Sequence, residues 1–243
     1  MAIHLCIDWG NTRVKLGVFQ ENKLVQDFNF PETEGLTAIM DVVQQVRPEA
    51  AILASVAHHP EELPALLRQE TRLVLLAPDT PVPVINAYQS PETLGMDRLA
   101  LAVGAHTLFP QKNNLVISLG TAVTYNFIQK GGTFRGGNIT PGLRLRFRAL
   151  HEFTDKLPLV DEKGGSMLLG YDTASAIRNG VIWGMAAEVE GMLNYYRSQY
   201  PDFNAVLTGG DLGLFADKLK NQIFADSHFL LKGLNSILNY NVR

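Results

Sequence analysis

The first polar segment of the chain contains residue types that can hold a phosphate group and its counter-ion. A short apolar strand runs into Asp8-Trp9-Gly10-Asn11-Thr12, and Arg13-Val14-Lys15 then begins a second strand. A glycine turn followed by a strand predicts a β-hairpin tip, whereas the phosphate loop of a Rossmann or P-loop protein opens a helix. The backbone N–H groups of such a tip, together with the side chains of Asn11 and Thr12, can approach a phosphate closely. Asp8 can hold a hydrated cation, and Lys15 can reach the negative charge of the phosphate. The alternative is an ordinary hairpin with a polar tip.

A second copy of this pattern opens the second half of the chain. The apolar, strand-like residues 115–119 are followed by Gly120-Thr121-Ala122-Val123-Thr124, which turns into Tyr125-Asn126-Phe127-Ile128. Two glycine–hydroxyl hairpins, one for each half, predict a duplicated fold whose halves clamp one phosphorylated ligand.

The composition predicts a folded protein with no electrostatic preference for nucleic acid. The 243 residues are enough for one large domain or two small ones, and 46% are hydrophobic against 19% charged. The formal net charge of −3, without a Lys/Arg stripe, gives no reason to expect nucleic acid as a partner. The single cysteine, Cys6, cannot form an internal disulfide, which fits a reducing compartment. Without a signal-peptide layout or a run of roughly 20 apolar residues, we expect a soluble cytoplasmic protein that does not enter a membrane.

The order of the expected elements repeats along the chain. Three strands, a helix, a strand and a helix are followed by the same order, which predicts an α/β fold with mixed sheets and a boundary near 111–114. The expected strands are 3–8, 14–19, 24–30, 51–56, 73–76, 115–119, 124–128, 133–139 and 205–207, and the expected helices are 36–46, 60–68, 93–108, one with Pro141 in its first turn, and 173–200.

Together these residues give the chain a resemblance to the type III pantothenate kinases of the acetate/sugar kinase–Hsp70–actin superfamily. The resemblance covers essentially the whole chain and rests on the joint order of Asp8–Lys15, Gly95-Met96-Asp97-Arg98, Gly120-Thr121, Gly136-Gly137-Asn138-Ile139-Thr140-Pro141-Gly142, Thr173–Gly180 and Thr208–Asp211. It implies duplicated ribonuclease H-like (actin-like ATPase) domains at 1–112 and 113–243, with mixed β-sheets flanked by helices. It also implies a cytoplasmic homodimer that uses ATP to phosphorylate pantothenate to 4′-phosphopantothenate, the first step of coenzyme A biosynthesis.

The resemblance implies roles for three nucleotide-binding segments. Phosphoryl transfer requires that the phosphates be held in line and their charge be neutralised. Asp8 would hold Mg²⁺ through water, Thr121 would donate to the phosphates, and the glycines after residue 208 would let the backbone lie close to the nucleotide. The implied ATP-binding residues are Asp8, Trp9, Gly10, Asn11, Thr12, Arg13, Val14, Lys15, Gly120, Thr121, Gly209 and Gly210.

The resemblance also implies a pantothenate site made of Tyr88, Gly95, Met96, Asp97, Arg98 and Thr173. Asp97 would accept the proton of the primary hydroxyl, and Arg98 would hold a ligand carboxylate or tie the loop down. Without the resemblance, Asp97 and Arg98 are a helix-entry acid and its surface partner, Tyr88 is a packing residue and Thr173 is a helix cap.

Two positions depart from the family pattern. The family usually has an Asp at the position of Ser118, where it binds an activating monovalent cation such as potassium or ammonium, and an acidic residue is common at the position of Asn126. Neutral oxygen ligands bind a cation less tightly, so we expect weak dependence on such a cation. The departures also motivate a rival function, a non-catalytic relative that acts as a regulatory or accessory binding protein. A second rival is a kinase of the same superfamily for another small alcohol.

Two further groups of side chains favour ordinary structural roles. His58-His59-Pro60 favours a surface loop over a metal site, because adjacent side chains point apart and no further His/Cys/Asp cluster joins them. Arg144, Arg146 and Arg148 are too few for nucleic-acid binding and favour a solvated face or salt bridges in a dimer.

Overall fold

The chain folds into two compact units in the computed structural model, which describes residues 2–55, 58–165, 167–200, 202–221 and 223–242. The first unit comprises the chain up to Gln111, residues 128–135 and the chain from His228 onward, and the second comprises 112–127 and 136–227. The predicted division at 112 and 113 lies next to the first change of unit. The predicted second half, however, supplies two pieces to the first unit, so the units are not two continuous halves.

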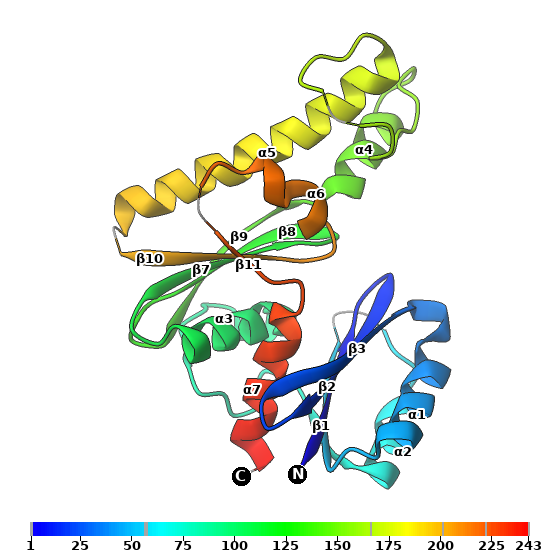
Figure 1. Cartoon of the computed structure of the whole chain (residues 1–243), viewed down its shortest axis with the longest axis vertical. Coiled ribbons are helices and arrows are strands. Elements are labelled where there is room, and N and C mark those ends of the chain that lie inside the picture. Colours follow the sequence, from blue (N-terminus) through cyan, green and yellow to red (C-terminus); the bar gives the residue numbers. More distant parts are fainter. Residues whose placement is uncertain (1, 56–57, 166, 201, 222, 243) are drawn as a thin grey trace. The chain divides into compact units, whose positions relative to one another are not determined.

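The sheet of the first unit has the strand order β3-β2-β1-β4-β5 (Figure 1). β1 (Ile3–Trp9), β2 (Arg13–Gln20) and β3 (Lys23–Pro31) are antiparallel neighbours. β4 (Ala50–Ser55) and β5 (Arg72–Leu75) extend the sheet in parallel to β1. β1 and β4 are buried along most of their length because helices cover both faces of the sheet, which explains their nearly continuous apolar sequences.

α1 (Gly35–Val46) and α2 (Leu63–Glu70) cover one face of this sheet (Figure 1). Each helix places an apolar stripe against alternate residues of the central strands. Trp9 belongs to this face, since a Cβ on Gly35 would lie only 2.7 Å from its ring. The buried residues of this core are Leu5, Ile7, Trp9, Val14, Leu16, Val18, Ile39, Val42, Val43, Ala51, Leu53, Leu63 and Leu67.

α3 (Met96–Leu108) and α7 (Phe229–Val242) pack against each other on the opposite face (Figure 1). Their close approach depends on glycine, because a Cβ on Gly233 would lie 2.1 Å from the carbonyl oxygen of Ala100. Side chains alternate along a strand, so Asp8 faces α3 and α7 while Trp9 faces α1. This alternation directs Asp8 toward the side of the sheet on which α3 begins.

The second sheet has the order β11-β10-β7-β8-β9-β6. β7 (Asn113–Leu119), β8 (Ala122–Ile128) and β9 (Thr133–Pro141) repeat the three-strand pattern, and β10 (Phe203–Thr208) runs parallel to β7. β11 (Phe224–Ala225) pairs with β10. β6 (Ile85–Asn86) pairs with the first residues of β9, which belong to the first unit.

α5 (Thr173–Gln199) is the long helix of the second unit, and α4 (Leu143–Glu152) packs against it. α5 begins in a capping box, in which the backbone N–H of Ser175 donates to the Asp172 carboxylate at 2.8 Å. The helix packs its apolar residues against β7 and β8. A four-residue helix, α6 (Leu212–Phe215), follows β10.

The predicted fold class is confirmed, and three strands followed by a helix occur in both halves. The rest of the predicted repeat is wrong, because α4 is followed directly by α5 before β10, and several boundaries are corrected. α3 begins at Met96 because Pro91–Thr93 forms a separate 3₁₀ turn and Gly95 is still extended. Pro141 ends β9 instead of opening α4. The predicted strand 51–56 ends at Ser55, and residue 56 lies outside the described residues. α7 was missing from the predicted elements.

In the described part of the chain, we find no helix that is both long enough and apolar enough to cross a membrane.

Candidate active site

Asp8 and Lys15 lie opposite each other at the tip end of the β1–β2 hairpin. They are paired in antiparallel register, so their side chains leave the same face of the sheet. Asp8 is only 8% exposed, whereas Lys15 is partly exposed. The hairpin therefore presents a buried carboxylate with an amine beside it.

Asp97 comes to the same region from the first turn of α3. A helix N-terminus favours a negative charge, and the backbone N–H groups of Asp97 and Arg98 act to lower the pKa of this carboxyl group. The preceding glycine leaves room for this arrangement, since a Cβ on Gly95 would lie 2.5 Å from Asp97 Oδ1. Gly95 and Asp97 thus act together in shaping the start of α3.

The negative charge of Asp97 acts on the carboxyl group of Asp8. Burial raises the pKa of Asp8 from 3.8 to about 6; the positive charge of Lys15 opposes this shift and the negative charge of Asp97 adds to it. Burial also raises the pKa of Asp97, against the backbone N–H and the charge of Arg98. Two acids with raised pKa values on one side of a sheet are typical of a functional site.

Arg98, which follows Asp97 in the chain, contacts the ring of Tyr88. The Arg98 guanidinium carbon lies 5.5 Å from the centre of the Tyr88 ring, a cation–π arrangement. Tyr88 in turn stacks on Phe134 with ring centres 6.2 Å apart. Arg98 is 4% exposed, so the interpretation of Arg98 as a surface partner is wrong. The predicted substrate residues Tyr88, Gly95, Met96, Asp97 and Arg98 therefore share one region of the first unit.

The hairpin tip divides the predicted phosphate-binding residues into two groups. Asn11, Thr12 and Arg13 are exposed, and the turn is closed by a 3.0 Å hydrogen bond from the Gly10 N–H to the Arg13 carbonyl. Trp9 and Val14 are buried in the core with α1, so their side chains support the tip from below. These two side chains are therefore not available to a ligand.

The second predicted hairpin lies beside the Thr208–Asp211 segment within the second unit. Ser118 is paired with Thr208 across the parallel strands β7 and β10. Gly209 has a φ of +105°, and a Cβ there would lie 2.3 Å from the carbonyl oxygen of Leu119. The structure thus brings Ser118, Gly120, Thr121, Gly209 and Gly210 to the carboxyl ends of two neighbouring strands. A phosphate or nucleotide site is expected at such an edge.

Thr173 and Asn126 lie elsewhere in the second unit. Thr173 is the exposed first residue of α5, and Asp172 is the cap before it. Asn126 is fully buried and donates hydrogen bonds to the Val116 carbonyl at 3.3 Å and to the Thr124 hydroxyl at 3.0 Å. The Asn126 amide is therefore built into the β7–β8 pair.

The buried carboxylate of Asp8 suits a magnesium ion that is shared with phosphate. Among the described residues, no group of three or more His, Cys, Asp or Glu side chains could hold a metal by itself. Mg²⁺ commonly takes one or two carboxylates, several waters and substrate phosphates. Asp8 fits this mode of binding, whereas a closed structural metal site would need more protein ligands.

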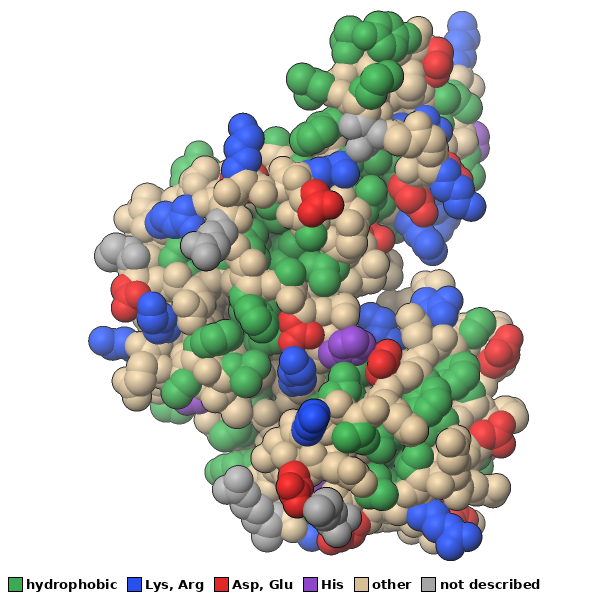
Figure 2. All heavy atoms as spheres, viewed as in Figure 1, with side chains coloured by type: hydrophobic (Ala, Val, Ile, Leu, Met, Phe, Trp, Pro, Cys, Tyr) green, Lys and Arg blue, Asp and Glu red, His purple; other side chains and the backbone are tan. Residues whose placement is uncertain are grey.

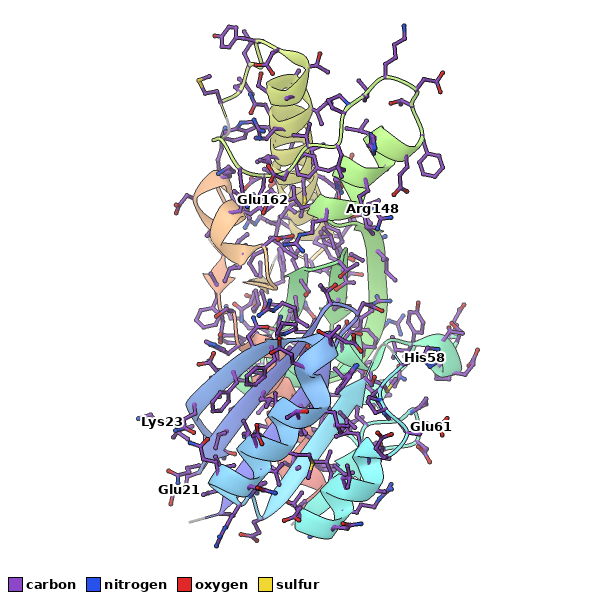
Figure 3. The ribbon with its side chains drawn as sticks, turned by 90° about the vertical axis from the view of Figure 1, so that its right-hand side faces the viewer. Glu21, Lys23, His58, Glu61, Arg148 and Glu162 are labelled. Atoms are coloured by element: carbon purple, nitrogen blue, oxygen red, sulfur yellow. The ribbon has the colours of Figure 1, made fainter. Side chains whose placement is uncertain are left out.

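His58, Arg146 and Arg148 lie outside the predicted site. His58 is exposed and belongs to no metal-binding group of the described residues (Figure 3). Arg148, labelled on α4 in Figure 3, pairs with Glu152 four residues later on the same helix. Arg146 pairs with Glu188 of α5 at 2.5 Å, so the expectation of a solvated face or a dimer salt bridge is wrong for this residue. Sequence reasoning missed Glu188, since nothing in its local pattern marks it.

The chain shares its fold with solved structures of kinases and related proteins. One is a Campylobacter jejuni protein of the Baf family of transcriptional activators, with a TM-score of 0.62, 19% identity and 98% of each chain covered. Another is the ROK hexokinase of Thermus thermophilus, with a TM-score of 0.52, 13% identity, and coverage of 99% of this chain and 100% of the hexokinase chain. The fold is thus that of the sugar kinase and actin-like ATPase class.

Sequence comparison gives the family within this class. The family model for type III pantothenate kinase matches residues 4–195. The chain is 44% identical to the type III pantothenate kinase of Phocaeicola vulgatus, over 98% of this chain and 99% of that protein. It is also 44% identical to the Bacteroides fragilis (strain ATCC 25285) enzyme, over 98% of both chains. The chain belongs to the type III pantothenate kinase family.

Proposed function

We propose that this protein transfers the γ-phosphate of ATP to the primary hydroxyl of pantothenate and so forms 4′-phosphopantothenate, the first step of coenzyme A biosynthesis. Family membership supports the substrate and the reaction. The observation that carries the mechanism is the pair of buried acids, Asp8 and Asp97, both with raised pKa values and near enough for the charge of Asp97 to act on Asp8.

Asp97 accepts the proton of the attacking hydroxyl. Its raised pKa makes it a stronger base than an ordinary exposed aspartate, and a carboxylate within hydrogen-bond reach takes the proton as the O–P bond forms. The backbone N–H groups at the start of α3 favour the ionised form of this carboxylate, which is the form that accepts a proton.

Lys15, together with a magnesium ion that Asp8 would hold, neutralises part of the negative charge of the phosphates. Bound Mg²⁺ supplies the neutralising charge that phosphoryl transfer requires. Asp8 would hold this ion, and Lys15 offers a positive charge from the paired position on β2. The exposed tip residues Asn11 and Thr12, and Gly120 and Thr121 of the second hairpin, donate hydrogen bonds to phosphate oxygens.

Arg98 and Tyr88 bind pantothenate next to Asp97. Tyr88 offers a rigid wall that is fixed by Phe134, and Arg98 offers charge for the substrate carboxylate or for the loop. Thr173 contributes a hydroxyl to the same substrate. The family resemblance alone supports this role for Thr173.

The proposal extends to the cation, the assembly and the compartment. Ser118 offers a hydroxyl where the family usually has a carboxylate, so potassium or ammonium activates this protein weakly.

We also propose a cytoplasmic homodimer. Figure 2 shows hydrophobic side chains gathered at the end of the second unit, where Phe153, Leu159, Met167, Leu168, Leu169 and Tyr171 are all more than half exposed.

The test is ADP release by the purified protein with ATP and magnesium, with pantothenate, glycerol or glucose as the acceptor. We expect turnover with pantothenate only. Turnover with another alcohol alone, or nucleotide binding without any turnover, would contradict the proposal.

A further inference from the structure

Glu188 on α5 collects hydrogen bonds from three other elements of the second unit. Its Oε1 accepts from the Tyr125 hydroxyl of β8 at 3.0 Å and from the Thr140 hydroxyl near the end of β9 at 2.7 Å. Its Oε2 accepts from the Arg146 guanidinium of α4 at 2.5 Å. One carboxylate therefore joins β8, β9 and α4 to the long helix.

The pKa shifts of Glu188 and Tyr125 give each of these two side chains one protonation state near neutral pH. Burial alone raises the pKa of Glu188, but the hydrogen bonds from Arg146 and Thr140 outweigh burial and hold it below its ordinary value. Burial and the charge of Glu188 raise the pKa of Tyr125. Glu188 is thus an ionised acceptor and Tyr125 a neutral donor, which gives the cluster one stable pattern of hydrogen bonds.

Arg146 links this cluster to the segment Thr140-Pro141-Gly142. Its Nε donates to the Pro141 carbonyl at 2.8 Å, while its other end binds Glu188. Thr140 is held directly by Glu188. The segment is therefore fastened at two successive residues on the side of α5.

The same segment touches the Gly120–Thr121 hairpin. The Gly142 N–H donates to the Thr121 carbonyl at 3.1 Å. A Cβ on Gly142 would lie 2.1 Å from the Gly120 carbonyl oxygen and 2.4 Å from that of Thr121, so the two backbones are in direct contact. A displacement of Gly142 would therefore displace the hairpin.

We propose that Glu188 is a positioning residue for the Gly120–Thr121 hairpin and sets the hairpin's hydrogen-bond donors for the phosphates of the nucleotide. It acts through Arg146 and Thr140 and touches no substrate itself. The inference rests on the proposed function for the assignment of this hairpin to phosphate binding. Groups that bind a reacting ligand gain precision when neighbouring hydrogen bonds hold them within a fraction of an ångström.

The main test compares Glu188→Gln with Glu190→Gln. Glu188→Gln keeps the shape and one acceptor oxygen but removes the charge that holds Arg146. Glu190 lies on the same helix and also gathers several donors, but its partners are the backbone N–H groups of Lys220 and Asn221 and the Asn221 amide. It is a matched control because it anchors a different segment with a similar carboxylate.

Titration calorimetry with a non-hydrolysable ATP analogue and magnesium measures the affected step. We expect Glu188→Gln to raise the Kd of the analogue and the KM for ATP about tenfold, with kcat changed by less than about threefold and the KM for pantothenate unchanged. Glu190→Gln should leave all four values near those of the unmodified protein. Unchanged nucleotide affinity in folded Glu188→Gln, or an equal loss in both variants, would overturn the positioning role.

A second variant keeps the inference testable if Glu188→Gln does not fold. Thr140→Val removes one donor to Glu188 with little change in volume, and it should raise the Kd of the analogue in the same direction by a smaller factor. An unchanged Kd in Thr140→Val would contradict the inference. The calorimetric result does not depend on pantothenate turnover. An unmodified protein that binds the analogue but does not phosphorylate pantothenate would therefore refute the proposed function and leave the positioning role to be decided by the variants.

Discussion

Asp8 at the end of β1 and Asp97 in the first turn of α3 are close enough for the charge of Asp97 to raise the pKa of Asp8. The two residues are far apart in the sequence, and the alternation of side chains along β1 directs Asp8 to the face on which α3 lies. The antiparallel register places Lys15 on the same face. An acid that holds an ion and an acid that accepts a proton can therefore work side by side.

Replacement of the proposed base should remove most of the activity. Asp97→Asn keeps the size of the side chain but cannot accept the hydroxyl proton, so we expect kcat to fall roughly 10²-fold or more with nucleotide affinity nearly unchanged. Steady-state kinetics and titration calorimetry measure the two quantities. Glu92→Gln, an exposed acid just before α3, is the control and should behave as the unmodified protein. Near-normal turnover of Asp97→Asn would contradict the assignment of Asp97 as the proton acceptor.

Removal of the proposed magnesium-binding carboxylate should abolish kinase activity without unfolding the protein. Asp8→Ala removes a charge and leaves the apolar core on the other side of β1 intact. Circular dichroism checks the fold, and kinetics over a range of magnesium concentrations check the role. Kinetics identical to those of the unmodified protein at every concentration would mean that the hairpin is only structural.

The stability of the metal-free protein should depend on pH through Asp8. Because the pKa of Asp8 is about 6 in the folded protein against an ordinary 3.8, the folded state binds the proton more tightly. Stability attributable to this group is therefore present at low pH and is lost as the pH rises through about 4 to 6. Asp8→Asn does not titrate, so its unfolding free energy relative to the unmodified protein should rise by up to about 3 kcal/mol between pH 4 and pH 7. Denaturant titrations in a chelator measure this difference, and a difference independent of pH would contradict the prediction.

A carboxylate at position 118 should increase the response to potassium. It adds a negative charge that is tolerable near phosphate only with a cation between them. We expect Ser118→Asp to be activated by potassium and to use ATP poorly in sodium buffer, while the unmodified protein responds weakly. Titrations with potassium at constant ionic strength compare the two proteins. Equally strong activation of the unmodified protein would show that a cation site exists without the carboxylate.

The sequence predicted local features well and long-range contacts poorly. The hairpins around Gly10 and Gly120 follow from residue types and spacing, and both are present. The return of α7 to the first unit was not predicted, because its packing depends on glycine contacts with α3, far away in the chain. The burial of Arg98 and the pairing of Arg146 with Glu188 likewise depend on tertiary neighbours that no local pattern specifies.

The most direct test of the central claim is to follow the phosphate from ATP to pantothenate. Phosphorus NMR and mass spectrometry of a reaction with the unmodified protein, ATP, magnesium and pantothenate identify the product and the oxygen that carries the phosphate. The account predicts one phosphate on the primary hydroxyl of pantothenate, formed in step with ADP, and almost none with Asp97→Asn. Unmodified pantothenate after complete incubation, or equal product from Asp97→Asn, would contradict it.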